Sequence, residues 1–418
     1  MNKRLLIILS LIVLALVVAG IIIIWINNRN ASPTGTTFNP TDTTLSGFPV
    51  SNPIVNPTTT SDNLLPTAPP STPSAVISTP TIPSILNKIS TTPVSGVTLS
   101  PQISSTTPPT IIYLEEGTGN LFRVTLDGQN NQQLTDSSLP GVVRTWWGIS
   151  QGKLTLLAQY LNKQETVITF RGTYNLNTTE KAELVGQTIG AVAPGAIAVS
   201  PSGDRFFSLI NTEAGVTGIV TEILTGKVNT VFTSHLKNWA VDWPTPTVIT
   251  LTPQASANLP GVLYFLNPNN KILTRILGEE LGLTTLVNHS GTKILYNRSL
   301  SELKLYSKLN KETRSLTITT LPEKCTWSRD NITIYCAVPN TPATAEYPDD
   351  WWSGEVTFND SFWRLNTDTG ETKIIWSGGR ATDNNNRLDA INLIFDEISE
   401  RLVFIDRWTA TLWSLDLR

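Results

Sequence analysis

From residue 85 to the C-terminus, apolar and polar residues alternate over short segments that glycine, proline, asparagine and aspartate separate. Alternation with period two between such turn residues is typical of β-strands. The clearest group of four segments covers residues 196–203, 204–210, 218–226 and 227–232. Similar groups recur about every 40 to 50 residues, the length of one propeller blade. The pattern therefore predicts an all-β propeller.

The number of these groups predicts the number of blades. Seven groups indicate a seven-bladed β-propeller over residues 85–418, with six or eight blades as alternatives because divergent blades are easily miscounted. The groups begin near Pro93, Gly141, Gly190, Leu236, Leu281, Glu323 and Arg387.

The last group contains only three strand-like segments before the chain ends at Arg418. Residues 85–90 precede the first full group and resemble a strand that has no other partner. We expect this segment to complete the last blade. Joining the two ends in this way closes the ring and removes exposed strand edges.

An apolar run occupies residues 5–26, and only Ser10 and Gly20 interrupt its hydrophobic side chains. As a helix it would span roughly 33 Å, enough to cross a bilayer core. A cleaved signal peptide is the alternative, but its apolar region is normally shorter and ends at a small-residue cleavage site. Lys3 and Arg4 precede the run and only Arg29 follows closely, so residues 1–4 should be cytoplasmic. The sequence therefore predicts a single-pass protein of the cell membrane whose propeller is extracytoplasmic, either periplasmic or at the cell surface.

Residues 27–84 are rich in threonine, serine and proline and carry very little charge. Frequent prolines prevent helices and sheets from propagating, and scattered aliphatic residues cannot bury enough surface to offset the entropy of ordering. We predict a disordered linker between the membrane helix and the propeller.

Composition excludes several classes of function. The net charge is -3, charged residues make up 15% of the chain, and no basic cluster follows Lys3 and Arg4. Nucleic-acid binding therefore lacks its electrostatic footprint. The chain has only two cysteines and two histidines, so neither a cysteine-based zinc site nor a disulfide-rich scaffold is expected. We predict no metal and no cofactor.

The two cysteines, Cys325 and Cys336, lie at equal distances from the midpoint between Asp330 and Asn331. These two residues favour a tight hairpin turn, which would place the cysteines directly opposite each other. Paired strand residues have a spacing that a disulfide bond can bridge, and an exported protein can oxidise them. We predict a disulfide bond, with buried free thiols as the alternative.

Residues 339–362 are the main irregular insertion in the repeat pattern and include Asp349, Asp350, Trp351 and Trp352. Acidic and aromatic side chains on a loop of a rigid scaffold can bind a protein, a peptide or a sugar. Alternatively, the tryptophans fold back onto the blade and the carboxylates are solvated. Trp146, in the expected inner strand of the second blade, is a further candidate for binding in the central channel, although packing between blades would also explain it.

Two segments resemble the strand and turn signatures of TolB-like propellers: residues 120–128 with 133–135, and residues 199–205. The chain is similar to this branch of the Trp-Asp-repeat-like propeller superfamily, although the usual Trp-Asp signature is absent. The resemblance implies an extracytoplasmic platform that binds proteins, and it carries over no catalytic residue.

These observations favour a non-enzymatic propeller that is anchored in the membrane and binds a protein or an envelope polymer. One alternative is a surface enzyme that acts on carbohydrates or hydrolyses another substrate with acids of the channel or loop. Another is a structural subunit of an envelope assembly. No catalytic residue is predicted, because no Gly-x-Ser-x-Gly elbow follows the propeller segment and no residues remain there for a peptidase domain.

Overall fold

A computed structural model describes residues 85–102, 108–136, 139–161, 166–178, 180–190, 196–298, 302–378 and 387–418. No helix within these ranges combines the length and the apolar character that a membrane crossing requires. The predicted membrane helix at 5–26, its cytoplasmic tip at 1–4 and the linker at 27–84 lie outside the described residues.

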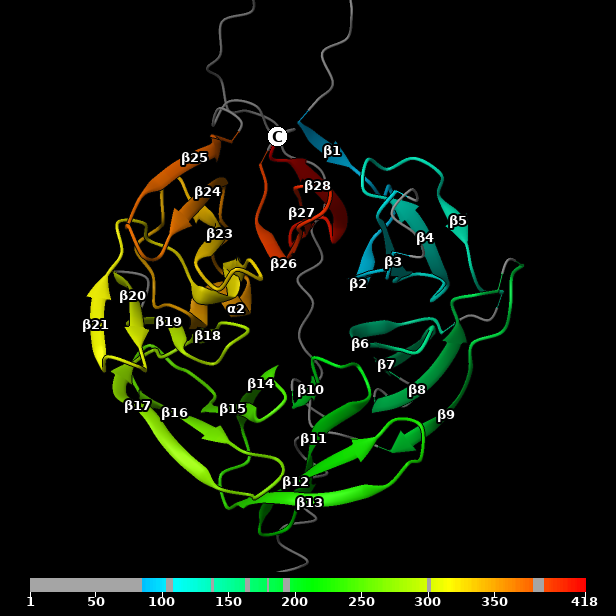
Figure 1. Cartoon of the computed structure of the whole chain (residues 1–418), viewed down its shortest axis with the longest axis horizontal. Coiled ribbons are helices and arrows are strands. Elements are labelled where there is room, and N and C mark those ends of the chain that lie inside the picture. The colour runs from blue at the N-terminus through cyan, green and yellow to red at the C-terminus, as the bar shows by residue number, and fades with distance from the viewer. Residues whose placement is uncertain are drawn as a thin grey trace, which may run out of the picture. The chain divides into compact units, whose positions relative to one another are not determined.

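The described residues form seven four-stranded antiparallel sheets arranged around a common centre (Figure 1). This arrangement confirms the predicted seven-bladed β-propeller. Six blades use four consecutive strands each, and the innermost strand of each comes first in sequence. The first three blades contain β2 (Val94–Leu99), β3 (Thr110–Glu115), β4 (Leu121–Thr125) and β5 (Gln132–Gln133); β6 (Val142–Ser150), β7 (Lys153–Leu161), β8 (Val167–Asn175) and β9 (Val185–Gly190); and β10 (Ile197–Val199), β11 (Arg205–Thr212), β12 (Gly215–Glu222) and β13 (Val228–Ser234).

The next three blades follow the same order. They contain β14 (Trp239–Thr245), β15 (Val248–Pro253), β16 (Pro260–Leu266) and β17 (Leu273–Leu281); β18 (Thr285–Val287), β19 (Lys293–Arg298), β20 (Glu302–Ser307) and β21 (Glu312–Ser315); and β22 (Cys325–Trp327), β23 (Thr333–Pro339), β24 (Asp360–Asn366) and β25 (Thr372–Trp376).

The seventh blade joins the two ends of the described chain. It contains β26 (Ala390–Asp396), β27 (Arg401–Asp406) and β28 (Thr411–Asp416), and its outer strand is β1 (Leu86–Lys88). Leu86 pairs with Leu415, and Lys88 pairs with Trp413. The ring is therefore closed by hydrogen bonds between strands rather than by packing alone, which leaves no open end to the repeat array.

The hydrophobic core lies between neighbouring blades. Adjacent residues of a strand point to opposite faces, and both faces of each blade are covered by a neighbour. Phe206 accordingly packs toward blade two and Phe207 toward blade four. Ile294 and Leu295 divide in the same way between blades four and six. Burial on both faces explains why the second strands of the blades are continuous apolar runs.

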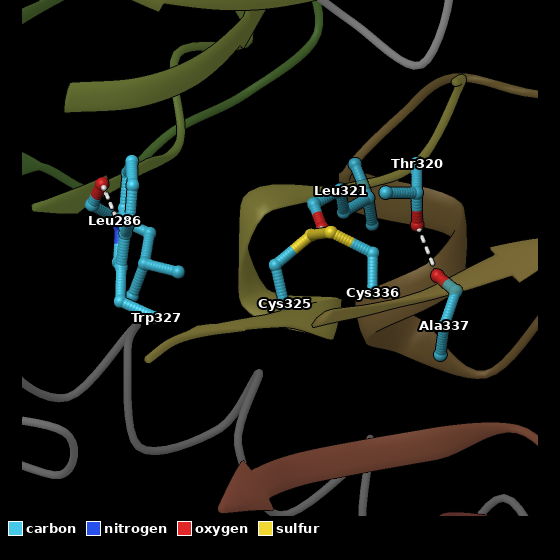
Figure 2. The surroundings of a disulfide bond; sticks show 7 residues. All are labelled: Leu286, Thr320, Leu321, Cys325, Trp327, Cys336 and Ala337. Atoms are coloured by element: carbon cyan, nitrogen blue, oxygen red, sulfur yellow. Dashed lines mark hydrogen bonds between the residues drawn. A yellow bond between two sulfur atoms is a disulfide. The ribbon is translucent and has the colours of Figure 1, made fainter. Parts of the chain in front are cut away.

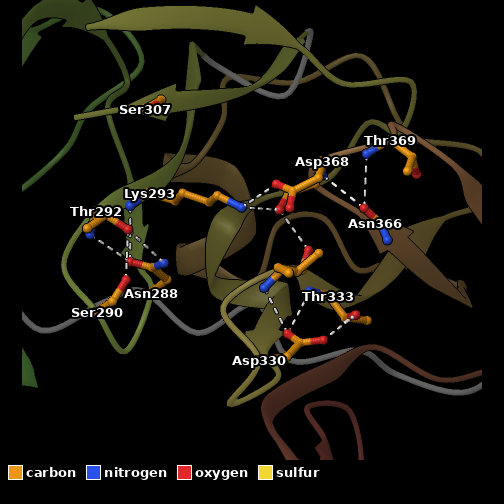
Figure 3. Close-up of polar contacts among 12 residues, drawn as sticks. Asn288, Ser290, Thr292, Lys293, Ser307, Asp330, Thr333, Asn366, Asp368 and Thr369 are labelled. Atoms are coloured by element: carbon orange, nitrogen blue, oxygen red, sulfur yellow. Dashed lines mark hydrogen bonds and ion pairs between the residues drawn. The ribbon is translucent and has the colours of Figure 1, made fainter. Parts of the chain in front are cut away.

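Polar turns connect the first and second strands of the blades. In blade five, Asn288 Oδ1 accepts hydrogen bonds from the backbone N–H groups of Thr292 and Lys293. In blade six, Asp330 Oδ1 accepts from Ile332 and Thr333 in the same manner (Figure 3). Side-chain acceptors of this kind stabilise tight turns because they satisfy backbone donors that lack a strand partner.

An ion pair links the neighbouring turns of blades five and six. The Lys293 ammonium donates to Asp368 Oδ1 at 2.7 Å and to Thr367 Oγ1 at 2.9 Å (Figure 3). Because the Lys293 side chain is largely covered, this contact fixes the two blades relative to each other better than a solvent-exposed pair would.

Cys325 and Cys336 form a disulfide bond across β22 and β23, as the sequence predicts (Figure 2). The two residues are direct partners in the strand register, with their Cα atoms 4.1 Å apart. Asn331 occupies the left-handed region of backbone space in the connecting turn, with φ at 59°. Asparagine tolerates this conformation better than most residues do.

Candidate functional site at the channel mouth

A cavity of about 980 Å³ lies at one end of the central channel. Each blade contributes to it, either from its inner strand or from the connection that enters that strand. One lining residue from each blade, in order, is Ser95, Trp146, Ile197, Asp242, Thr285, Glu323 and Ile394. We call this cavity the channel mouth. It collects side chains that are up to about three hundred residues apart in sequence, which a propeller achieves by pointing all inner strands at one axis.

The insertion between β23 and β24 reaches the channel mouth and contains the short helix α2 (Asp349–Ser353). On one side, Asp349 Oδ2 accepts a hydrogen bond of 2.6 Å from the Ala257 backbone N–H of blade four. On the other side, Arg407 of blade seven donates to the Trp352 carbonyl at 3.1 Å. The insertion of blade six therefore connects to blades four and seven.

The carboxylates of Asp349 and Asp350 are half-buried, and both serve the local backbone. Asp350 Oδ2 accepts from the Glu346 N–H at 2.7 Å, which stabilises the loop leading into α2. Asp349 makes the contact to Ala257 described above. Neither carboxylate is simply solvated, and both hold the insertion in its position.

Trp351 is buried, with 4% of its surface exposed. Its indole N–H donates to Asp389 Oδ2 at 3.0 Å, and its ring lies 5.9 Å from that of Phe358. The Arg407 guanidinium lies 4.9 Å from the ring centre, within the range of a cation–π interaction. Although Trp351 touches the cavity, its contacts are those of a core residue.

Trp352 is half-buried and lines the channel mouth. Its indole N–H donates to Glu323 Oε2 at 3.3 Å. Of the two adjacent tryptophans, Trp351 therefore anchors the insertion and Trp352 contacts a charged group of the cavity.

Glu323 is a titratable group of the channel mouth whose pKa is strongly raised. Water reaches its side chain through the cavity, but the surrounding protein disfavours the ionised form and raises its pKa to about 7. The hydrogen bond from Trp352 and the positive charge of Lys324 oppose this shift without cancelling it. Sequence reasoning missed this residue because nothing in the pattern distinguishes a single acid before an inner strand from a solvated turn residue.

Asp242, on the inner strand β14, is a second carboxylate of the channel mouth. The surrounding protein raises its pKa, although a hydrogen bond of 2.7 Å from the Trp243 N–H favours the ionised form. Its positive counterparts in the cavity lining are Arg144 and Arg407. Arg407 is engaged by the insertion, whereas Arg144 is exposed and makes no hydrogen bond or ion pair with any described residue.

Trp146 lies on β6, half-buried, at the edge of the cavity. It packs against the cluster that Ile197 and Phe206 form between blades two and three. The structure thus brings Trp146 and Trp352 to the same cavity, while Asp349 and Asp350 support the insertion beside it.

A buried ion triad lies behind the channel mouth. The Lys324 ammonium is fully buried and lies 2.9 Å from Asp360 Oδ2 and 2.5 Å from Asp389 Oδ1. Burial raises the pKa of Asp360 to about 6, although the positive charge of Lys324 opposes the shift. Asp389 also accepts the indole N–H of Trp351, so the triad holds the insertion to the core of the ring. Across the described part of the chain, no group of three or more metal-ligating side chains comes together.

Scans against protein-family models and against curated proteins found no match. The chain is similar in structure to TolB from Acinetobacter baumannii, with 15% identity and a TM-score of 0.41. That match covers 62% of this chain and 59% of TolB. An oligogalacturonate lyase from Vibrio parahaemolyticus matches with 11% identity and a TM-score of 0.48, over 78% of this chain and 97% of the lyase. A puromycin-hydrolysing peptidase from Mycobacterium tuberculosis matches with 13% identity and a TM-score of 0.46, over 74% of this chain and 50% of the peptidase.

These likenesses concern the fold alone. The chain spans about three fifths of the TolB chain and half of the peptidase. The closed ring of seven four-stranded sheets establishes a seven-bladed β-propeller, and TolB is among the propellers that it resembles.

Proposed function

We propose that this protein is a non-enzymatic binding platform that engages a partner at the channel mouth. The observation that carries the proposal is the cavity of about 980 Å³, to which all seven blades contribute and which contains charged groups that form no ion pair with any described residue. Asp242 and Arg144 are the clearest of these: each is exposed to the cavity, and neither has an ion-pair partner among the described residues. Concave sites with a few convergent polar groups are the usual binding sites of proteins.

The proposed location is extracytoplasmic, with the propeller tethered to the cell membrane by residues 5–26. The uninterrupted apolar run supports the anchor, and the Cys325–Cys336 disulfide supports an oxidising compartment. Alkaline extraction tests the anchor. The full-length protein should remain with the membrane fraction, whereas a variant without residues 1–26 should be released.

Site-directed photocrosslinking in native cells tests the binding site. A photoreactive amino acid at Gln254, which is exposed in the channel mouth, should yield a defined adduct. The same amino acid at Glu312, on the outer strand β21, serves as the control and should yield none. Equal labelling at both positions, or no adduct at Gln254, would contradict the proposed site. Trp352→Ala should weaken the adduct, and it is a cleaner variant than Trp351→Ala because Trp351 belongs to the core.

A second candidate function is hydrolysis of a surface substrate. The observation in its favour is that the pKa of Glu323 is raised to about 7, which suits a general acid near neutral pH. Turnover of a panel of glycans by the full-length protein, lost in Glu323→Gln and retained in Glu312→Gln, would support this function. Absence of turnover across the panel would count against it.

A further inference from the structure

The polar groups of the channel mouth indicate the chemistry of its ligand. We infer that the channel mouth contains a subsite for the cationic side chain of a partner peptide, an arginine or a lysine, with the Glu323 carboxylate as its counter-ion and Trp352 beside it. This inference rests on the proposed function and narrows the partner to a peptide chain with an accessible basic residue.

The first argument is that Glu323 lacks a cation of its own. The Trp352 indole, which donates a hydrogen bond to Glu323, is uncharged. The neighbouring Lys324 directs its ammonium into the core, where it contacts Asp360 Oδ2, Asp389 Oδ1 and the Ala390 carbonyl. An ammonium group has three donors, so these three acceptors use its full capacity. No described residue forms an ion pair with Glu323. Its carboxylate can therefore form an ion pair with a cation of the ligand.

The second argument is electrostatic. A carboxylate that the surrounding protein disfavours, as the raised pKa of Glu323 shows, gains more from an incoming cation than a carboxylate in bulk water does. The attraction between two charges grows as the local dielectric constant falls. Asp242 is a second carboxylate of the same cavity that forms no ion pair with any described residue, and Arg144 and Arg407 are the positive groups of the lining.

The third argument distinguishes a peptide from a polysaccharide. The carboxylate subsite requires a positive charge, which neutral and acidic polysaccharides do not carry. Arg144 of the same cavity has no partner among the described residues and can donate to the backbone carbonyls of such a peptide. The cavity of about 980 Å³ has room for several residues of an extended chain. The next residue after Arg407, Trp408, is 74% exposed and offers apolar contact surface on the same connection.

The side chain of Trp352 has a defined part in this subsite. Its N–H holds one oxygen of the Glu323 carboxylate at 3.3 Å, which limits the rotation of that side chain. Its ring, half-buried at the wall of the cavity, can contact the methylene groups of a lysine or arginine. Preorganisation of this kind lowers the entropy that binding would otherwise cost.

The test compares two labelled peptides that differ in one charge. Acetyl-Gly-Gly-Arg-Gly-Gly-amide and its citrulline counterpart have nearly the same shape, but citrulline is neutral. Fluorescence polarisation with the full-length protein at pH 8, where Glu323 is ionised, should show that the arginine peptide binds about tenfold more tightly. Glu323→Gln should abolish the difference between the peptides, and Glu312→Gln on the outer strand should preserve it.

The possible outcomes separate the subsite from the platform. Equal affinity for both peptides, or a difference that survives Glu323→Gln, would overturn the cation subsite even if Gln254 still crosslinks a partner. Failure of the arginine peptide to bind at all would overturn it as well. If a neutral glycan added before irradiation suppressed the Gln254 adduct and the arginine peptide did not, the mouth would bind a polymer instead. Circular dichroism of Glu323→Gln should match the wild type, because this side chain is exposed to the cavity.

Discussion

Replacing Lys324 by methionine removes the one cation of the buried triad and keeps a similar side-chain volume. Lys324 is fully buried, as is Asp360, and Asp389 is 1% exposed at its side chain. The variant would leave two carboxylates in the core without a positive partner. Removing one partner of a buried ion pair costs about 3 to 5 kcal/mol, because the remaining charge keeps its desolvation penalty. We expect the free energy of unfolding to fall by that amount at pH 8.

Asp360→Asn is the matched control. It leaves Lys324 paired with Asp389 and removes the excess negative charge of the triad. Asp360 Oδ1 has no hydrogen-bond partner among the described residues, and burial raises the pKa of this carboxyl to about 6. At pH 8, Asp360 is therefore ionised in a site that favours its protonated form. Replacing it by asparagine should lower the free energy of unfolding by less than about 2 kcal/mol.

The pH dependence follows from the direction of the shift. The pKa of Asp360 is above its ordinary value of 3.8, so the folded state favours the protonated form. The contribution of this carboxyl to the free energy of unfolding is fully present below its pKa in the unfolded state, and it is lost as the pH rises through about 6. The stability of Asp360→Asn relative to the wild type should therefore improve between pH 5 and pH 8.

Guanidinium unfolding of the oxidised full-length protein, followed by near-ultraviolet circular dichroism, measures these differences. The reasoning fails if Lys324→Met loses less than about 1 kcal/mol, or if Asp360→Asn is as unstable as Lys324→Met at pH 8. Either result would mean that water or a rearrangement compensates the buried carboxylates.

Three further predictions concern the same region. Replacing both Cys325 and Cys336 by alanine should lower the free energy of unfolding by about 2 to 3 kcal/mol, and reduction of the wild type should have the same effect on its unfolding midpoint. Trp351→Ala should cost about 3 to 5 kcal/mol because the ring is buried, whereas half-buried Trp352 should cost much less in the same unfolding assay. Glu323→Gln should become more stable relative to the wild type as the pH rises through about 7, because the folded state disfavours ionised Glu323. Water screens this carboxylate, so the gain should stay below about 1 kcal/mol across a pH series of guanidinium midpoints.

The blades were predictable because one physical constraint repeats along the chain. Each blade is covered on both faces, so its second strand is an apolar run, and polar turns with glycine or asparagine must follow. The predicted start at Gly141 lies one residue from Val142, where β6 begins. The predicted start at Gly190 is the last residue of β9 in the preceding blade, seven residues before Ile197, where β10 begins. Strand pattern identifies a blade better than it identifies its first residue.

The disulfide was predictable for a related reason. In an antiparallel hairpin, the turn determines the register, and the register determines which residues face each other. The turn at Asp330 and Asn331 therefore decides the pairing of Cys325 with Cys336. Here a local signal is sufficient because the two partners are only 11 residues apart.

The channel mouth required the structure because no local signal places its members together. Asp242 and Glu323 belong to different blades, and only the closed ring directs both to one axis. The alternation within an inner strand shows that some residue faces the channel, but not which polar residue keeps a perturbed pKa there. The insertion posed a similar difficulty, since Trp351 and Trp352 are adjacent in sequence yet have opposite surroundings.

Two pairs of consecutive residues, Glu323 with Lys324 and Trp351 with Trp352, connect the channel mouth to the core. In the 3-10 turn Pro322–Lys324, Glu323 faces the cavity and contacts Trp352, while Lys324 faces the core, where Asp389 holds Trp351. A displacement of Lys324 would therefore move the backbone that carries Glu323, and a shift of α2 would move both tryptophans. Lys324→Met should consequently weaken binding of the arginine peptide as well as stability, although Lys324 does not line the cavity. Asp360→Asn, which preserves the contact between Lys324 and Asp389, should leave that binding unchanged.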